Sequence, residues 1–153
     1  MLKEIIPNCT FVDHGIDWIL HEGNPQNEWY KNYNTIHYQV FDHKIPYIYN
    51  FAKKKFKKFT TSIIKQEPGM VIPLHKDEYF HFKKTHQCDD SKIVRYNIFL
   101  EDWQSGHYFE VDNTPIVGWS KGQYIELDDT IPHRSANVGD VNKYTAQITG
   151  SLL

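Results

Sequence analysis

Between residues 60 and 150 the chain is a series of short β-type segments separated by turn residues, and this series constrains the fold more than any other feature. The segments are rich in β-branched and aromatic residues and recur at a spacing of roughly ten residues. Predicted strands cover residues 60–65, 71–77, 93–100, 107–111, 123–127, 131–137 and 143–149. Seven or eight short strands at this spacing predict an antiparallel β-sandwich or barrel within a single domain of 153 residues.

The first 59 residues differ from the rest, because they are irregular and rich in Asn, Tyr and His. Residues 13–20 predict a short helix, and residues 33–41 predict a strand. Residues 48–59 predict an amphipathic helix, because apolar residues recur there at helical spacing and lysines fill the opposite side. We therefore expect residues 1–59 to form a helical and irregular support region, with one or two helices packed on an outer face of a β-barrel core formed by residues 60–150.

Charge and composition narrow the class of protein. A formal net charge of −2 gives no general attraction to nucleic acid or to a membrane surface, and no apolar run approaches the length of a membrane span. The two cysteines, Cys9 and Cys88, are too few for a disulfide scaffold and are expected to be reduced thiols. No signal peptide is recognised at the start of the chain. We therefore expect a cytoplasmic protein whose partner is a small molecule or a peptide, with no nucleic-acid or membrane partner.

The segment His75-Lys76-Asp77 carries the main metal-binding signal. Side chains alternate along a strand, so His75 and Asp77 point to one face while Lys76 points away. With nine His and 19 acidic residues among 153, chance alone gives about one His-x-acid pair, so the pair needs support. Support comes from His133 at the start of a later strand and from Lys143, ten residues further on. Two His and one carboxylate leave three metal positions open, as a non-haem Fe(II) oxygenase requires.

In this order and spacing the residues resemble the superfamily of 2-oxoglutarate- and Fe(II)-dependent oxygenases. Besides the two His, Asp77 and Lys143, the resemblance rests on residues 95–102, 106–111 and 119–122. The most similar branches are the prolyl and the aspartyl/asparaginyl hydroxylases. The resemblance implies a mainly β fold, the double-stranded β-helix, which is a jelly-roll or cupin-like barrel.

The same resemblance implies the chemistry. The implied metal-ligating and catalytic residues are His75, Asp77 and His133, which would hold Fe(II). Lys143 would bind the far carboxylate of the co-substrate 2-oxoglutarate, although the family usually has Arg there, which offers a planar fork rather than a point charge. The implied reaction consumes O2, with ascorbate as an accessory reductant. It hydroxylates an unactivated C–H bond of an amino-acid side chain or a small metabolite and releases succinate and CO2.

Arg95 and Thr145 are further candidates for binding the co-substrate. If the apolar residues of its strand face an outer packing layer, Arg95 points into the barrel. There it either binds a carboxylate or forms an ion pair with an acidic residue such as Glu110 or Asp102. Thr145 shares a face with Lys143, so its hydroxyl either contacts the same carboxylate or bonds to the backbone.

The sequence is also compatible with two other functional interpretations. His107 is either a spare candidate ligand, as in cupins, where the metal often has three His and one Glu, or a histidine that is satisfied within the cavity. A cupin-like metal-binding enzyme would have no use for a buried cation at Lys143. A non-catalytic barrel with a vestigial site is the third reading.

The remaining polar and aromatic residues of interest are expected near the site or at strand ends. His81, His86 and Cys88 are expected in a polar loop at the mouth of the site. Trp103 and Trp119 either pack at strand ends or stack on substrate.

Overall fold

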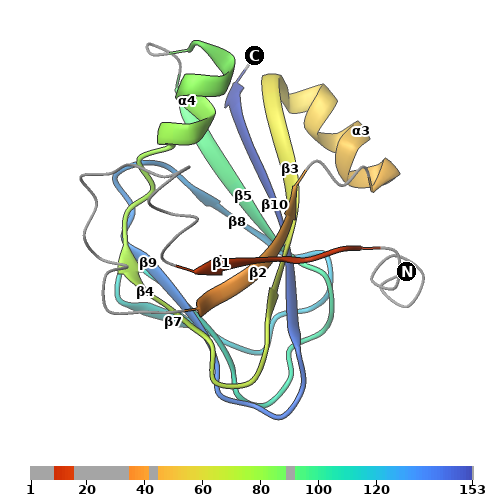
Figure 1. Cartoon of the computed structure of the whole chain (residues 1–153), viewed down its shortest axis with the longest axis vertical. Coiled ribbons are helices and arrows are strands. Elements are labelled where there is room, and N and C mark those ends of the chain that lie inside the picture. The colour runs from red at the N-terminus through yellow and green to blue at the C-terminus, as the bar shows by residue number, and fades with distance from the viewer. Residues whose placement is uncertain (1–8, 16–34, 42–44, 89–91, 153) are drawn as a thin grey trace.

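The computed structural model describes residues 9–15, 35–41, 45–88 and 92–152. Within these residues the chain forms ten strands, which are arranged in two antiparallel sheets, and two helices (Figure 1). Neither of these helices is long and apolar enough to cross a lipid bilayer.

Six strands form the larger sheet. In their order across the sheet they are β1 (Val12–Gly15), β2 (Thr35–Phe41), β3 (Phe56–Gln66), β10 (Lys143–Leu152), β5 (Ile93–Phe99) and β8 (Tyr124–Leu127). The long strand β10 pairs with β3 on one side and with β5 on the other, so the C-terminal strand lies in the middle of the sheet.

Four strands form the smaller sheet. In spatial order they are β4 (Val71–His75), β9 (His133–Asn137), β6 (His107–Val111) and β7 (Thr114–Ile116). From β3 onward the chain passes back and forth between the two sheets, and only the hairpin β6–β7 stays within one of them. Eight strands wound in this way form a double-stranded β-helix, so the predicted fold class is confirmed. Strands β1 and β2 extend the larger sheet beyond this barrel.

The sequence predicted most barrel strands but missed β7. Asp112 and Asn113 precede it with φ of 47° and 62°, as a two-residue type I′ hairpin turn requires. The turn was expected from its residues, whereas a strand of three residues has too few positions to show an alternating pattern. In addition, β4 ends at His75, so Asp77 lies beyond the strand rather than on it.

The helix α3 (Pro46–Lys55) begins with a proline in its first turn and ends with three lysines, as helix termini favour. The predicted helix, residues 48–59, was too long, because Phe56 begins β3. Phe56 pairs with Leu152 of β10, so the backbone from residue 56 onward obtains its hydrogen bonds from the sheet. The side chain of Phe56 is buried at the start of the strand, so its apolar character, which suggested a helix, reflects burial rather than helical spacing.

Three other expectations concern the first half of the chain and the segment after Asp77. The predicted helix at residues 13–20 was wrong where the structure describes it, since Val12–Gly15 is β1, and residues 16–20 lie outside the described part. The predicted strand at residues 33–41 is confirmed as β2 from Thr35 onward. The predicted polar loop is partly a helix, α4 (Phe80–His86), which lies at the same end of the barrel as α3 (Figure 1).

The outer face of the larger sheet packs against α3. Ala146 and Ile148 of β10 and Tyr96 of β5 form one buried cluster with Ile48 and Ala52 of the helix. Alternation along each strand then turns the opposite face of β5 and β10 toward the smaller sheet. This face is unusually polar for a barrel interior, and it carries the candidate site.

Candidate metal centre

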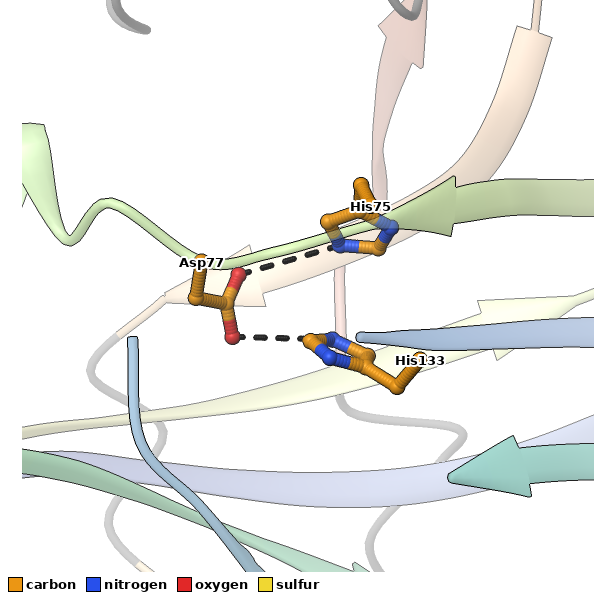
Figure 2. A group of neighbouring side chains, drawn as sticks. All are labelled: His75, Asp77 and His133. Carbon is orange, nitrogen blue, oxygen red and sulfur yellow. Dashed lines mark ion pairs between the residues drawn. The ribbon is translucent and has the colours of Figure 1, made fainter. Parts of the chain in front are cut away.

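Three potential metal ligands converge at one end of the smaller sheet. Strands β4 and β9 are neighbours, and His75 and His133 are direct partners in their ladder. Asp77 follows the end of β4, and its carboxylate lies beside both imidazoles (Figure 2). Its Oδ1 lies 3.7 Å from Nε2 of His75, and its Oδ2 lies 3.6 Å from Nε2 of His133. Among the described residues, these three form the group whose ligand atoms all lie within 4.8 Å of one another.

Each imidazole is oriented by the backbone carbonyl two residues before it in the chain. Nδ1 of His75 lies 2.7 Å from the carbonyl oxygen of Pro73, and Nδ1 of His133 lies 3.1 Å from that of Ile131. A carbonyl accepts only, so Nδ1 carries the proton and Nε2 carries the lone pair. Burial lowers the pKa of His75 to about 4, although the Asp77 carboxylate opposes this shift, and burial likewise lowers the pKa of His133. Both rings are therefore neutral at pH 7, as metal ligation requires.

Asp77 is buried and paired with Arg95. Nη1 of Arg95 lies 2.9 Å from Oδ1 and 2.8 Å from Oδ2, but only Oδ1 is aligned to accept a hydrogen bond from it. Within the described residues Oδ2 has no hydrogen-bond partner. Burial acts to raise the pKa of the Asp77 carboxyl, but Arg95 and the two imidazoles outweigh burial and hold that pKa below its ordinary value. The carboxylate is therefore charged, and both of its oxygens lie close to Nη1 of Arg95.

The three side chains fit a divalent first-row metal. Two ligands about 2.1 Å from one ion lie about 3.0 Å apart at a right angle and about 3.4 Å apart in a tetrahedral arrangement. The observed separations of 3.6 and 3.7 Å, which involve different oxygens of Asp77, are slightly longer, and one ligand atom from each residue lies within 4.8 Å of the others, so a side-chain adjustment would bring the three atoms onto one ion. Two neutral imidazoles and one carboxylate are the donor set of the facial triad that binds Fe(II).

Lys143 lies inside the barrel, with only 2% of its surface exposed. Its Nζ donates to the carbonyl oxygen of Tyr108 at 2.7 Å, to Oε1 of Gln66 at 3.1 Å and to the hydroxyl of Ser135. All three acceptors are neutral, and in the part of the chain that the structure describes no carboxylate forms an ion pair with this ammonium. Burial therefore lowers the pKa of Lys143 to about 7.

Gln66 and Ser135 extend the polar cluster around Lys143. Oε1 of Gln66 accepts from the lysine and, at 2.7 Å, from the Ser135 hydroxyl, and these two bonds orient the amide. Its Nε2 is then buried without a hydrogen-bond partner in the described structure. Ser135 lies two positions after His133 on β9 and so faces the same interior. An ammonium, a hydroxyl and an unsatisfied amide N–H together favour an anion, because donors exceed the acceptors available to them.

Comparisons with known proteins are informative for the fold. No protein-family model matches the chain, and no curated protein matches its sequence. A prolyl-4-hydroxylase from Pseudomonas putida has a similar structure, with a TM-score of 0.56 at 13% identity over 76% of this chain and 72% of that one. KdgF from Halomonas sp. is similar with a TM-score of 0.53 at 8% identity over 96% and 90% of the two chains. At such identities the likeness is one of fold. The shared fold is the double-stranded β-helix.

A cavity of about 370 Å³ lies beside the metal centre. Its lining consists of Asp77, Glu78, Phe80, Lys83 and Asp129. Asp77 belongs both to this lining and to the three candidate ligands, so the cavity borders the metal centre on the side of that carboxylate.

Arg95 points into the barrel as expected, but its ion pair is with Asp77 rather than with Glu110 or Asp102. The carboxylate of Glu110 pairs instead with Arg134 at 2.7 Å, on the other face of the smaller sheet. Thr145 is buried on the same face of β10 as Lys143. Co-substrate binding by Arg95 and Thr145 stays a prediction.

His107 lies away from the three ligands. It pairs with Asn137 at the far end of β9, and its Nε2 contacts the carbonyl oxygen of Val141 at 3.2 Å. Trp119 stacks on Phe99 with ring centroids 3.9 Å apart, so its packing role is confirmed. Neither Cys9 nor Cys88 forms a disulfide in the described part of the chain.

Sequence reasoning missed two residues of the interior cluster. Ser135 could have been predicted from the sequence, because His133-x-Ser135 repeats the period of two that was used for His75 and Asp77. Gln66 follows directly after a predicted strand, but nothing local distinguishes it from a solvent-exposed glutamine.

Proposed function

We propose that this protein is a non-haem Fe(II)- and 2-oxoglutarate-dependent oxygenase. It hydroxylates an unactivated C–H bond of an amino-acid side chain or a small metabolite, with succinate and CO2 as co-products. The observation that carries the proposal is the pairing of two features inside one barrel. One is a buried triad of two neutral His and one Asp, and the other is a buried lysine that has no anionic partner among the described residues.

The lysine favours an anionic co-substrate over a purely structural role. Lysine is almost never fully buried unless it is paired, because desolvation of an ammonium is unfavourable. Lys143 instead has neutral acceptors, and the neighbouring Gln66 amide has an unsatisfied donor. A carboxylate that replaced one of these acceptors would restore the charge of Lys143 and satisfy Gln66 Nε2.

In this proposal each group of residues has a separate task. His75, Asp77 and His133 hold Fe(II), and Lys143 with Gln66 and Ser135 receives the far carboxylate of 2-oxoglutarate. Fe(II) with 2-oxoglutarate and O2 supplies the oxidation of the C–H bond. The chain itself binds and orients the reactants and restricts the access of water to the barrel interior.

The primary substrate is expected to approach through the cavity beside Asp77. Exposed Phe80 supplies an apolar surface there, and Glu78, Lys83 and Asp129 supply charges of both signs. A side chain or a small metabolite that carries both apolar and charged groups fits such a lining.

The competing proposal is a cupin-like metal enzyme that does not use 2-oxoglutarate. It accounts for the triad but does not explain why the ammonium group of Lys143 is buried inside the barrel. The position of His107, away from the three ligands, also gives no support to a four-ligand cupin centre.

The first experiment measures conversion of 2-oxoglutarate to succinate by Fe(II)-loaded protein with and without O2. With ascorbate present we expect O2-dependent succinate formation even without a primary substrate, because ascorbate supplies the two electrons that a substrate C–H bond would otherwise provide. If the metal-loaded protein neither converted nor bound 2-oxoglutarate, the protein would not use this co-substrate, and the cupin-like proposal would be favoured.

The second experiment tests Lys143 directly. In Lys143→Ala, affinity for 2-oxoglutarate should fall by about 10- to 150-fold, because a charge-assisted contact worth roughly 1.5–3 kcal/mol is lost. Metal affinity should be nearly unchanged. Lys121→Ala, in an exposed turn, is the control. Equal co-substrate affinities in Lys143→Ala and wild type would exclude Lys143 as the contact and make Arg95 the next candidate.

A further inference from the structure

The carboxylate of Asp77 is held differently from the two imidazoles. His75 and His133 lie on paired strands, and each ring bonds to a carbonyl of its own strand region. Asp77 lies in residues 76–79, which belong to neither a strand nor a helix. Its side chain obtains its orientation from the other sheet, through Arg95 of β5.

Arg95 is itself fixed on two further sides. Its Nε donates to the hydroxyl of Thr149 on the adjacent strand β10 at 3.0 Å. Its guanidinium carbon lies 5.4 Å from the centre of the Tyr79 ring, and the Tyr79 hydroxyl donates to the carbonyl oxygen of Leu127 at 2.8 Å. A guanidinium that is held by a hydroxyl and an anchored aromatic ring has little freedom to follow a moving carboxylate.

We infer that Arg95, held by Thr149, is a positioning residue for the candidate metal ligand Asp77. Its Nη1 donates a hydrogen bond to Oδ1 at 2.9 Å and lies 2.8 Å from Oδ2, so one guanidinium nitrogen fixes the whole carboxylate. In this orientation Oδ1 faces the imidazole of His75 and Oδ2 faces that of His133. This inference rests on the metal centre of the proposed function but not on the identity of the co-substrate.

The test uses Co(II) as the probe, in the absence of 2-oxoglutarate. Arg95→Gln removes the guanidinium, and Thr149→Val removes only the hydroxyl that holds it. We expect Arg95→Gln to change the visible absorption spectrum of the Co(II)-loaded protein and to lower Co(II) affinity by about 10- to 100-fold, as loss of a residue that orients a metal ligand commonly does. Thr149→Val should change both in the same direction by less, and Thr149→Ser should restore the wild-type values.

The controls separate positioning from other roles. Arg134→Gln breaks an ion pair on the other face of the smaller sheet and should leave the Co(II) spectrum unchanged. Should Arg95→Gln fail to fold, Thr149→Val decides, because Thr149 contacts Arg95 and not Asp77. Wild-type spectra and affinities in the variants that fold, Thr149→Val among them, would overturn the inference. Normal Co(II) results with no turnover of 2-oxoglutarate would instead overturn only the proposed function.

Discussion

His75 and His133 are direct partners across the ladder of β4 and β9, and their ring centroids lie 4.4 Å apart. The two imidazoles of the candidate centre are therefore brought together by strand register. A slip of one residue would turn one ring to the outside of the barrel, since side chains alternate with a period of two. The carboxylate of Asp77 depends instead on Arg95, so the two parts of the centre can be disturbed separately.

Removal of the Asp77 carboxylate, a candidate ligand, should sharply weaken metal binding. In Asp77→Ala we expect Fe(II)-dependent activity to disappear and metal affinity, measured by calorimetry, to fall sharply, while the strands that carry both His stay in place. The matched control is Asp129→Ala, which removes a carboxylate from the same cavity but not from the triad. Unchanged metal affinity in Asp77→Ala would show that this carboxylate is not a ligand.

Lys143 should make stability depend on pH. The unfolded chain keeps the lysine proton up to its ordinary pKa of 10.5, whereas the folded protein without co-substrate releases it near 7. Between these values the unfolded state binds more protons, so the free energy of unfolding should rise with pH. The rise should be clear between pH 7 and about 9, below the range in which tyrosines titrate.

Urea unfolding at a series of pH values measures this dependence. Lys143→Met keeps a long unbranched side chain without the charge, and it should remove the rise. A wild-type curve with the same slope as that of Lys143→Met would contradict the assignment of a lowered lysine pKa.

Gln66→Glu should convert the anion site into an internal ion pair. The new carboxylate would lie where Oε1 now accepts from Lys143, 3.1 Å from Nζ. We expect the thermal stability of the protein without co-substrate to increase at pH 7, because the buried ammonium gains a counter-charge. Affinity for 2-oxoglutarate should fall by about tenfold or more, because two carboxylates would compete for one cation.

Calorimetry and thermal melts of the same samples test the two effects together. Gln104→Glu, at an exposed position, serves as the control. If Gln66→Glu bound 2-oxoglutarate as tightly as wild type, the co-substrate carboxylate would have to lie elsewhere.

Gly106 should be intolerant of any side chain. Its φ is +87°, in the region that favours glycine, and an added Cβ would collide with backbone atoms of Gly139. The two glycines let the turns before β6 and β10 touch at one end of the barrel. Gly106→Ala should therefore lower the free energy of unfolding by about 1–3 kcal/mol or more, whereas Gly122→Ala, which has a similar φ but open space around it, should lower it less. Equal losses in denaturant unfolding would show that the contact is unimportant.

The sequence by itself determined the architecture of the barrel. Alternating, β-branched segments with turn residues between them located most strands, because a half-buried strand imposes a period of two on its own residues. The same period put His75 on an inward face, and the spacing to His133 and Lys143 indicated a metal ligand and a buried cation. These signals are local, or they depend only on the order of the strands along the chain.

Only the tertiary structure decided which charges meet. Arg95 pairs with Asp77 across the two sheets, and Gln66 reaches Lys143 and Ser135, although no local pattern links these positions. The end of α3 at Lys55 was likewise decided by pairing with β10. Sheet order and register arise from contacts between residues far apart in the chain, and they select among side chains whose local patterns are equally compatible with other partners.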